Sequence, residues 1–423
     1  MFTVLDLFCG AGGLAEGFRQ AGCRIVGGVD SDPDACATFA ANFPEATNIV
    51  GDLRRPRIRE RVLDLARNVE IVIGGPPCQA FSQVRNHDRL IDDPRNSLYR
   101  EFVRIVRVST PSAFLMENVP GLDQLGVRDQ VLADLCLEGE YRVLSQVVDA
   151  VDFGVPQSRK RILFIGIRRS LSFDPPELSG TQASRRLFLI RRNGSRIRYA
   201  IKPRDEEARS LLERLRDPMD DGVVTVEQAI GDLAGLRAGT KNDELSYSDL
   251  PDPSSAYQLK ARGRRRNALS NVSVPRINAD TKIRLRGIPK GGNHGDLCYP
   301  LTKRYLTGNR WGPHNGTGRL TRRHYYAYRK LYPGFWSWTL NTKADSVYHY
   351  DRGRALTVRE FARIQSFPDS FCFTTDDRRG ELPGRIFGGA VHSRYRQAGN
   401  AVPPLLGKAI ALSIVKTLTK VED

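Results

Sequence analysis

The first 170 residues alternate short aliphatic runs with amphipathic stretches, and this alternation constrains the fold more than any other feature of the chain. A short aliphatic run between turn signals predicts a buried strand, and an amphipathic stretch between two such runs predicts a connecting helix. We expect strands at Thr3–Phe8, Ile25–Val29, Ile49–Gly51, Ile71–Gly74, Ala113–Glu117, Val143–Asp149 and Arg161–Ile167. Strands joined by helices run in the same direction, so the pattern predicts an α/β domain with a mostly parallel sheet and helices on both faces.

This rhythm ends after residue 170. Residues 171–353 are rich in prolines, glycines and polar loops, so we expect a second, smaller and irregular domain there. An amphipathic helix returns near Ala355–Phe367, within the segment 354–397. Residues 398–423 include the apolar stretch Val402–Leu418, which we expect to form a closing helix that completes the first domain.

The second domain carries nearly all of the net charge of +17. From Gln258 to Lys330 the sequence has 18 Lys and Arg residues and only two acids, Asp280 and Asp296. An arginine-rich proteome would spread basic residues along the whole chain, so this concentration indicates a polyanionic partner. The overall content, 40% hydrophobic and 27% charged, is typical of a soluble globular protein and excludes a disordered or fibrous chain.

We expect neither a membrane span nor an export signal. The longest charge-free stretch, Ile71–Val84, has 14 residues and two prolines, whereas a bilayer span needs about 20 apolar residues. Met1 leads directly into a strand-like segment without a basic leader. The seven cysteines include no C-x-x-C pair, which favours reduced thiols over a disulfide framework or a zinc ribbon. These features predict a cytoplasmic protein.

A glycine-rich turn follows the first expected strand, in the segment Asp6-Leu7-Phe8-Cys9-Gly10-Ala11-Gly12-Gly13-Leu14. Glycines between a strand and a helix let a ligand approach backbone N–H groups. Asp30, 20 residues after Gly10, ends the second strand, where an acid can bind ribose hydroxyls, and Asp52 follows the third. The turn lacks the full G-x-G-x-x-G spacing, so we favour a single adenosyl group, such as that of S-adenosylmethionine, over a dinucleotide.

A stiff cysteine-containing loop follows the fourth expected strand, in the segment Gly74-Gly75-Pro76-Pro77-Cys78-Gln79-Ala80-Phe81-Ser82. The fifth strand ends at Glu117. Because ligands bind outside the carboxyl ends of parallel strands, we expect Cys78 and Glu117 to face one pocket, with Cys78 as a nucleophile. The cysteines that we assign to packing, in or beside apolar segments, are Cys9, Cys23, Cys36, Cys136 and Cys372.

Six segments resemble, in order, the motifs of the cytosine-5 DNA methyltransferase family and in particular its bacterial restriction–modification members. They are the glycine turn, Pro76-Pro77-Cys78-Gln79, Glu117-Asn118-Val119, Gln157-Ser158-Arg159-Lys160-Arg161, Arg354-Ala355-Leu356-Thr357-Val358-Arg359-Glu360 and Gln397-Ala398-Gly399-Asn400-Ala401-Val402-Pro403-Pro404. The resemblance covers residues 1–170 and 354–423. It implies the Rossmann-like fold of S-adenosylmethionine-dependent methyltransferases, with residues 171–353 as the target-recognition domain that binds DNA.

The resemblance implies methyl transfer from S-adenosylmethionine to carbon 5 of a cytosine in duplex DNA, without a metal. Carbon 5 is a poor nucleophile, so a thiolate must first add to carbon 6, and nearby positive charge would favour the thiolate of Cys78. Glu117 can protonate or hydrogen-bond N3 and the exocyclic amine. Strand alternation puts Gln157, Arg159 and Arg161 on one side. We expect Arg161 to reach cytosine O2 and Arg159 to steady the nucleophile loop or a phosphate.

The cofactor residues expected from these motifs are Asp6, Phe8, Gly10, Ala11, Gly12, Gly13, Leu14, Asp30, Ser31, Asp52, Leu53, Pro76, Asn400 and Val402. A target base must leave the duplex to enter such a pocket, which costs on the order of a few kcal/mol. Phosphate and guanine contacts from the basic span would offset this cost. The expected DNA contacts are Gln79, Ser82, Arg262, Arg264, Arg265, Arg266, Arg319, Arg322 and Arg323.

Two other functions stay open at this point. The first is an RNA cytosine-5 methyltransferase acting on transfer RNA, which the long basic insert disfavours. The second is a cofactor-binding DNA-binding regulator without catalysis, which would not need Cys78, Glu117 and Arg161. For the favoured function we expect a monomer that associates with the nucleoid through DNA, while a cognate restriction endonuclease acts separately.

Two groups of residues in the second domain are interpreted as structural. One group has potential zinc ligands whose spacing fits no common metal site: His294, Cys298, His314 and His324. The other group has large apolar side chains that we assign to the core of this domain: Trp311, Trp336 and Trp338.

Overall fold

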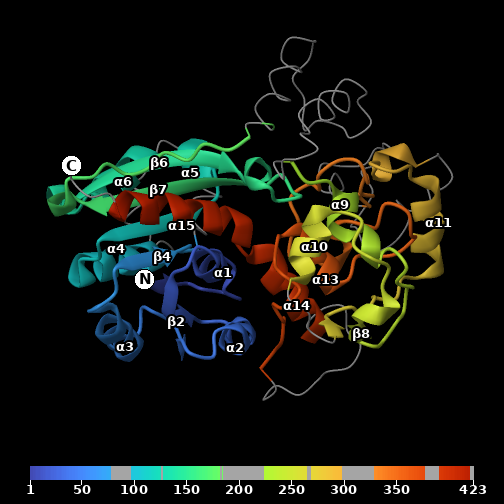
Figure 1. Ribbon diagram of the computed structural model, residues 1–423, viewed down its shortest axis with the longest axis horizontal. Helices are drawn as coiled ribbons and strands as arrows, with labels where there is room; N and C mark the ends of the chain where they lie inside the picture. Colours follow the sequence, from blue (N-terminus) through green and yellow to red (C-terminus); the bar gives the residue numbers. More distant parts are fainter. Residues whose placement is uncertain are drawn as a thin grey trace, which may run out of the picture.

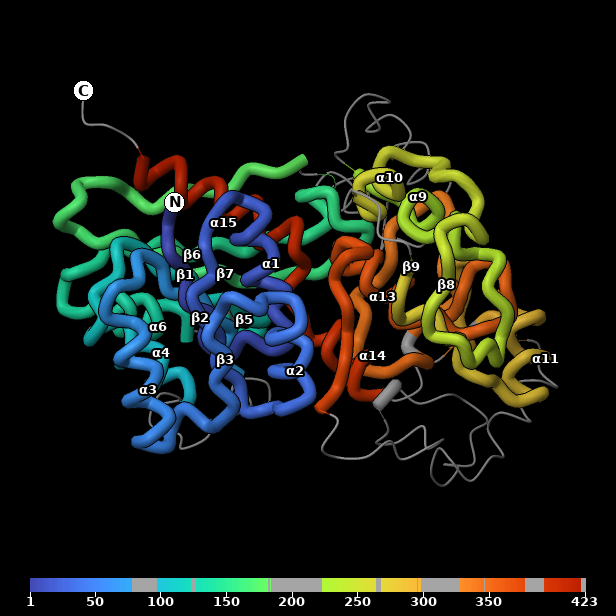
Figure 2. The backbone as a smooth tube through the Cα atoms, turned by 60° about the horizontal axis from the view of Figure 1, so that its bottom comes forward, coloured from blue at the N-terminus to red at the C-terminus, as the bar shows by residue number. Residues whose placement is uncertain are grey.

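The computed structural model describes residues 1–77, 97–124, 127–181, 183, 223–263, 268–297, 328–376 and 390–419. Its elements form two lobes that lie side by side (Figure 1). The first lobe contains the sheet, the helices of the N-terminal half and the last helix of the chain. The second lobe contains the short helices between residues 226 and 400, and Figure 2 shows the same separation from another direction.

Among the described residues, seven strands form the sheet of the first lobe, in the order β3-β2-β1-β4-β5-β7-β6. They are β1 (Thr3–Leu7), β2 (Arg24–Asp30), β3 (Thr47–Val50), β4 (Ile71–Gly74), β5 (Ala113–Asn118), β6 (Tyr141–Asp149) and β7 (Lys160–Arg168). Neighbours from β3 to β5 are parallel, and β7 is antiparallel to both β5 and β6. The seven predicted strands are confirmed, with ends that differ by at most two residues.

The alternation of side chains along the strands separates two hydrophobic cores. In β4, Ile71 and Ile73 belong to one core and Val72 to the other. All three side chains are fully buried. A strand that is covered on both faces has no solvent-facing positions, which explains why this segment is a continuous aliphatic run.

Helices cover both faces of the sheet (Figure 1). The helices of the first lobe are α1 (Gly13–Gln20), α2 (Pro33–Asn42), α3 (Pro56–Ala66), α4 (Ser97–Ser109), α5 (Gly121–Gln124), α6 (Arg128–Leu135) and α15 (Pro404–Leu418). Phe18 of α1 and Ile410 of α15 pack in one core, whereas Val62 of α3 and Phe102 of α4 pack in the other. The predicted Rossmann-like arrangement is therefore confirmed.

The last helix, α15, lies directly against α1 from the opposite end of the chain. A side chain on Gly17 would lie 2.6 Å from the Cα atom of Gly407, so the helices approach closely because neither residue has a Cβ atom. By length and composition, His392–Leu418 is apolar enough to cross a membrane. In the fold this stretch consists of most of α14 (Ala390–Asn400) followed by α15, whose buried face packs on the first lobe.

In the part of the second lobe that the structure describes, the regular elements are short. They are α9 (Val226–Ile230), β8 (Glu244–Ser246), α10 (Ala256–Arg262), β9 (Ala268–Ser270), α11 (Ala279–Gly287), α13 (Val358–Ile364) and α14. Strands β8 and β9 form a small antiparallel sheet. Single 3-10 turns in the two lobes lie at Leu137–Gly139, Ala150–Phe153, Arg169–Leu171, Gly231–Leu233, Tyr247–Asp249, His294–Asp296 and Ala344–Ser346.

Helix α13, which is shorter than the expected Ala355–Phe367, packs against α9 and α14 and is anchored by buried charges. The Thr357 hydroxyl accepts from the Glu360 N–H at 3.0 Å, and the Glu360 carboxylate accepts from the Thr357 N–H at 2.8 Å. Arg354 donates to both Glu360 oxygens, at 2.7 and 2.8 Å. Arg363 pairs with Asp232 at 2.7 Å. Removing one partner would leave a buried charge uncompensated, so these contacts tie α13 to the core of the second lobe.

The cysteines that the structure describes lie where packing predicts. Cys9, Cys23 and Cys36 are buried, and Cys136 and Cys372 are half-buried. Trp336 is also buried and packs on the ring of Phe335, with centroids 4.2 Å apart. Among the tryptophans and the potential zinc ligands predicted for the second domain, Trp338 is half-buried and His294 is buried. Four lie outside the described residues: Cys298, Trp311, His314 and His324.

Candidate active site

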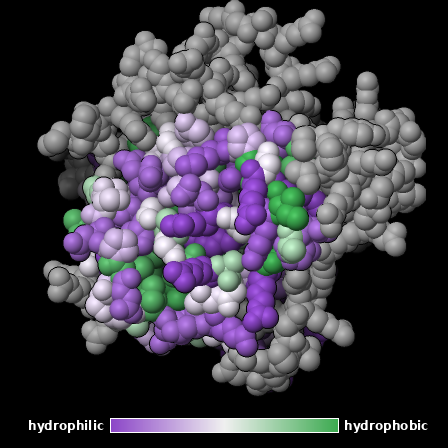
Figure 3. Space-filling model, turned by 90° about the vertical axis from the view of Figure 1, so that its right-hand side faces the viewer, coloured by the Kyte–Doolittle hydropathy of each residue, from purple (hydrophilic) through white to green (hydrophobic). Residues whose placement is uncertain are grey.

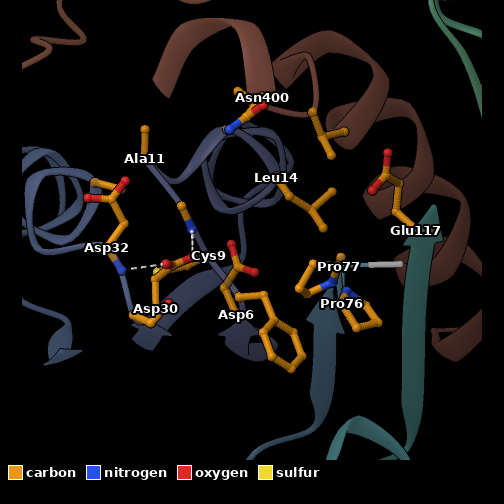
Figure 4. Close-up of a pocket in the computed structure, with 18 of the residues that line it drawn as sticks. Asp6, Cys9, Ala11, Leu14, Asp30, Asp32, Pro76, Pro77, Glu117 and Asn400 are labelled. Atoms are coloured by element: carbon orange, nitrogen blue, oxygen red, sulfur yellow. Dashed lines mark hydrogen bonds between the residues drawn. The ribbon is translucent and has the colours of Figure 1, made fainter. Parts of the chain in front are cut away.

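A cavity of about 640 Å³ lies at the carboxyl ends of the parallel strands and is closed on another side by residues 396–402. Figure 4 shows Asp30 and Asp32 at one end of it and Pro77 and Glu117 at the other. The predicted cofactor residues that line the cavity are Asp6, Phe8, Gly10, Ala11, Gly13, Leu14, Asp30, Ser31, Asp52, Leu53, Pro76, Asn400 and Val402. Sequence motifs from both ends of the chain therefore meet around one space.

The glycine turn is shaped by three positions. Gly10 has φ +51° and donates from its N–H to Asp30 Oδ2 at 2.9 Å. Gly12 has φ +92°, and a side chain there would lie 2.6 Å from the ring of Phe43, so Gly12 supports the turn from behind and does not line the cavity. A Cβ atom on Gly13 would collide with the carbonyl oxygen of Val402. This contact requires glycine, and it places the turn at residues 399–402, the late turn, beside the glycine turn.

Asp30 is held in one orientation by the backbone. Its Oδ2 accepts from Gly10 N–H and its Oδ1 from Asp32 N–H, both at 2.9 Å. Burial raises the pKa of Asp30, although these hydrogen bonds oppose the rise. A carboxylate fixed in this way at the end of a strand presents its remaining lone pairs to hydroxyl donors of a ligand.

The environment of Asp6 suits a ligand that donates hydrogen bonds. Its side chain is almost completely buried, and its Oδ2 has no hydrogen-bond partner among the described residues. Burial raises the pKa of Asp6 well above its usual range. A buried polar atom without a partner is costly. An ammonium or hydroxyl donor entering the cavity would therefore find an acceptor on this side.

Asp52 carries an arginine partner that sequence reasoning missed. Arg54 also lines the cavity, and its guanidinium donates to both Asp52 oxygens at 2.6 to 3.1 Å. These hydrogen bonds lower the pKa of Asp52, so the acid stays ionised. The signal was present in the sequence, since Arg54 lies two residues after Asp52, but the geometry of the turn decides that the two side chains meet.

Glu117 lies at the end of β5 and is 8% exposed. It forms an ion pair with Arg161 Nε. A side chain on Gly75 would lie 2.9 Å from Glu117 Oε2, and the neighbouring Asn118 Nδ2 donates to the carbonyl oxygen of Pro76 at 3.0 Å. The glutamate therefore lies next to the proline segment that leads to Cys78. Cys78, Gln79 and Ser82 themselves lie outside the described residues.

The two arginines of the Q-x-R-x-R block have different environments, although both line the cavity. Arg161 faces Glu117. Arg159 is buried and donates to the carbonyl oxygens of Gly399 at 2.9 Å and Asn400 at 3.2 Å, and burial lowers its pKa. In this structure Arg159 therefore holds the late turn of the cavity, a contact that the sequence did not suggest.

Gln157 does not share this cavity-facing position. It is fully buried, and its Nε2 donates to Gln365 Oε1 at 2.7 Å. Gln365 Nε2 in turn donates to the carbonyl oxygen of Ala398 at 2.7 Å. The expectation that Gln157 lies with Arg159 and Arg161 is corrected here: Gln157 precedes β7, and its hydrogen bond connects it to Gln365, the residue after α13.

Among the predicted DNA contacts, only Arg262 lies in the described part of the chain. Its guanidinium donates to Asp232 Oδ2 at 2.6 Å and to the carbonyl oxygen of Pro251 at 2.6 Å. The structure thus gives Arg262 a packing role within the second lobe. The predicted contacts outside the described residues are Gln79, Ser82, Arg264, Arg265, Arg266, Arg319, Arg322 and Arg323.

Comparison with known proteins gives one consistent result. The family model described as C-5 cytosine-specific DNA methylase matches residues 2–416. The chain is 31% identical to the type II methyltransferase M1.HphI of Haemophilus parahaemolyticus, over 99% of this chain and 87% of that protein. It is 30% identical to the type II methyltransferase M.AgeI of Thalassovita gelatinovora, over 97% of this chain and 98% of that protein.

The fold also resembles that of a solved protein. A crystal structure of a proposed DNA modification methyltransferase encoded within an E. coli prophage superposes with a TM-score of 0.66. The two sequences are 24% identical, and the match covers 99% of this chain and 100% of that one. The two proteins therefore share their architecture across both lobes.

Proposed function

The chain belongs to the C-5 cytosine-specific DNA methylase family, and from this premise we propose how its residues methylate DNA. The enzyme transfers a methyl group to carbon 5 of cytosine. One observation supports the assignment of its active site: Glu117 and Arg161 line the same cavity as Asp30, beside the proline segment that precedes Cys78.

We assign the cavity to S-adenosylmethionine, which supplies an electrophilic methyl group when bound. Asp30 is oriented to accept hydrogen bonds from ribose hydroxyls. Leu53 and Asp52 also line the cavity, and they suit the adenine ring and its amino group. Asp6, with its unpartnered buried oxygen, suits a cationic or hydroxyl donor of the ligand. No described residue group suggests a metal site.

Cys78 is proposed as the nucleophile that adds through sulfur to carbon 6 of the target cytosine. Glu117 would hydrogen-bond or protonate N3, so that the negative charge formed by the addition is neutralised. Arg161 would bind O2 and balance the charge of Glu117, with which it is already paired. When carbon 5 takes the methyl group, the S–CH3 bond of the sulfonium would break and leave S-adenosylhomocysteine. A water molecule would then accept the carbon 5 proton, the thiolate would leave carbon 6, and the N3 proton would return to Glu117, which restores the aromatic ring.

The substrate is duplex DNA, and the target base must leave the stack to reach Cys78. The basic residues of 258–330 would supply the phosphate contacts, so DNA affinity should fall steeply with salt. The named relatives are type II methyltransferases, which supports a role in a restriction–modification system with a separate endonuclease. We further propose a cytoplasmic, nucleoid-associated monomer.

Methyl transfer with tritiated S-adenosylmethionine tests the substrate. We expect label on duplex DNA and none on transfer RNA. Label on RNA alone, or on neither acceptor, would reject the proposal. Bisulfite sequencing of DNA from a host that expresses the chain then identifies the methylated sequence.

A duplex with 5-fluorocytosine at the identified position tests the nucleophile, because fluorine at carbon 5 blocks the elimination that releases sulfur. We expect a covalent protein–DNA adduct for the wild type and for Cys136→Ser, a control that changes a half-buried thiol. Cys78→Ser should form no adduct. An adduct in that variant would exclude Cys78 as the nucleophile.

A further inference from the structure

One ion pair joins two walls of the cavity. Arg396 Nη2 lies 2.6 Å from Asp32 Oδ2. Asp32 follows β2 in the first lobe, whereas Arg396 belongs to α14, and both side chains line the cavity. The side chains of Arg396 and Asp32 are 41% and 30% exposed, so the pair lies at the solvent edge of the cavity.

We propose that the Asp32–Arg396 pair is a latch that sets how fast the adenosyl cofactor and its demethylated product leave. The inference rests on the proposed function, namely that this cavity binds an adenosyl group. In this role Arg396 and Asp32 are positioning residues, since they act on the width of the cavity and not on the reacting atoms.

The other contacts between α14 and α2 are buried and form a fixed base below the latch. Ser393 Oγ donates to Asp34 Oδ2 at 2.7 Å, and Thr38 Oγ1 donates to Gln397 Oε1 at 2.6 Å. All four of these residues are buried. Hydrogen bonds that are shielded from water persist longer than an exposed ion pair, which is screened by salt and solvent. The solvent edge is therefore where α14 and the Asp32 loop separate most easily.

Asp32 also connects the latch to Asp30, the residue that we propose binds the ribose. Its Oδ1 accepts from the Asp34 N–H at 3.1 Å, which caps α2, and its own N–H donates to Asp30 Oδ1 at 2.9 Å. The oxygen that meets Arg396 is thus the one that does not cap the helix. When the pair is closed, the Asp30–Asp32 loop is held against α14, and the cavity keeps its full lining.

The test measures release of S-adenosylhomocysteine by stopped-flow displacement, together with its binding by calorimetry. Asp32→Asn keeps a helix-capping oxygen and loses the charge, and Arg396→Gln removes the other partner. Because an exposed ion pair contributes little free energy to holding the cavity closed, we expect release to be about two- to fivefold faster in each variant. The double variant should resemble the single ones, since the second change removes no further interaction.

The salt dependence of product release distinguishes a latch from a packing effect. Wild-type release should accelerate as NaCl screens the pair, whereas release from Asp32→Asn and Arg396→Gln should respond little. A loss of packing alone would lower thermal stability and leave the salt response of release unchanged, which would overturn the proposal.

A matched control lies two residues earlier on the same helix. Arg394 pairs with Asp243 at 2.7 Å inside the second lobe, and neither residue lines the cavity. Arg394→Gln should release product at the wild-type rate, and an equal acceleration in this control would refute the latch. If wild-type protein binds no S-adenosylhomocysteine, the cofactor assignment itself fails; if it binds and the latch variants release at the wild-type rate, only the latch fails.

Discussion

Arg161 on β7 and Glu117 on β5 form an ion pair at the carboxyl edge of the sheet. The two strands are antiparallel neighbours, so the beginning of β7 lies beside the end of β5. A glutamate and an arginine from different motifs thereby reach the same end of the cavity. Their pairing puts a carboxyl group and a guanidinium at one point of the cavity, and these are the two groups that we propose as donors to N3 and O2 of the cytosine.

Glu117→Gln tests this pair. The amide still forms hydrogen bonds but cannot protonate the ring, so methyl transfer should fall about 10²- to 10⁴-fold while S-adenosylhomocysteine binding is retained. The measurement is single-turnover transfer of tritium to DNA. Glu138→Gln changes an acid with an 86% exposed side chain and should keep full activity. Transfer by Glu117→Gln within threefold of the wild-type rate would remove Glu117 from the mechanism.

Arg159→Met tests the contact between Arg159, the residue before β7, and the turn at residues 399–400. The change leaves the carbonyl oxygens of Gly399 and Asn400 without their donor, so we expect unfolding free energy to fall on the order of 3 kcal/mol and cofactor KM to rise. Urea unfolding and a KM measurement check both effects. Arg168→Met is the matched control at the other end of the same strand, where Arg168 donates to Thr110; it should destabilise the fold without raising KM. Equal KM values in the two variants would contradict the assignment.

Gly13→Ala tests the closure of the cavity by the chain's two ends. The added methyl group would collide with the carbonyl oxygen of Val402, so the turns must separate, at a cost of about 1–3 kcal/mol. We expect S-adenosylhomocysteine affinity to fall roughly tenfold, measured by calorimetry. A methyl group on Gly121 has nothing within 4 Å, and Gly121→Ala should bind normally. Unchanged affinity in Gly13→Ala would show that the late turn is not part of the binding site.

His349→Asn tests a pH dependence of stability. Burial lowers the pKa of His349 from 6.5 to about 4, so the unfolded chain binds this proton more tightly than the folded one. The contribution of neutral His349 to the free energy of unfolding is complete above pH 6.5, the pKa of this residue in the unfolded chain. It is lost as the pH falls from 6.5 towards 4. The loss between pH 7.5 and pH 5 should be about 2 kcal/mol.

Asparagine keeps an acceptor for the N–H groups of Asp351 and Arg352, which His349 Nδ1 now accepts at 3.1 Å, but it does not titrate. Urea unfolding at the two pH values should therefore show a larger loss for the wild type than for His349→Asn. Equal losses in the two proteins would mean that other groups cause the acid sensitivity.

The strands of the first lobe were predictable because their physics is local. Ile71, Val72 and Ile73 form an aliphatic run that is buried on both faces. Such a run predicts a strand without information from the rest of the chain. The glycine turn was predictable for a similar reason, since Gly10 and Gly12 adopt positive φ. The roles of Gln157 and Arg159 were not predictable, because their partners lie more than 180 residues away in the sequence.

Sequence alone determined the strands of the first lobe and the glycine turn, because propensity, periodicity and turn formation depend on neighbouring residues. Tertiary structure alone decided which of the site residues meet. Arg161 pairs with Glu117 because β7 is antiparallel to β5, and Arg396 reaches Asp32 because side-chain hydrogen bonds hold α14 against α2. Contacts of this kind depend on the packing of the whole chain, and no local pattern records them.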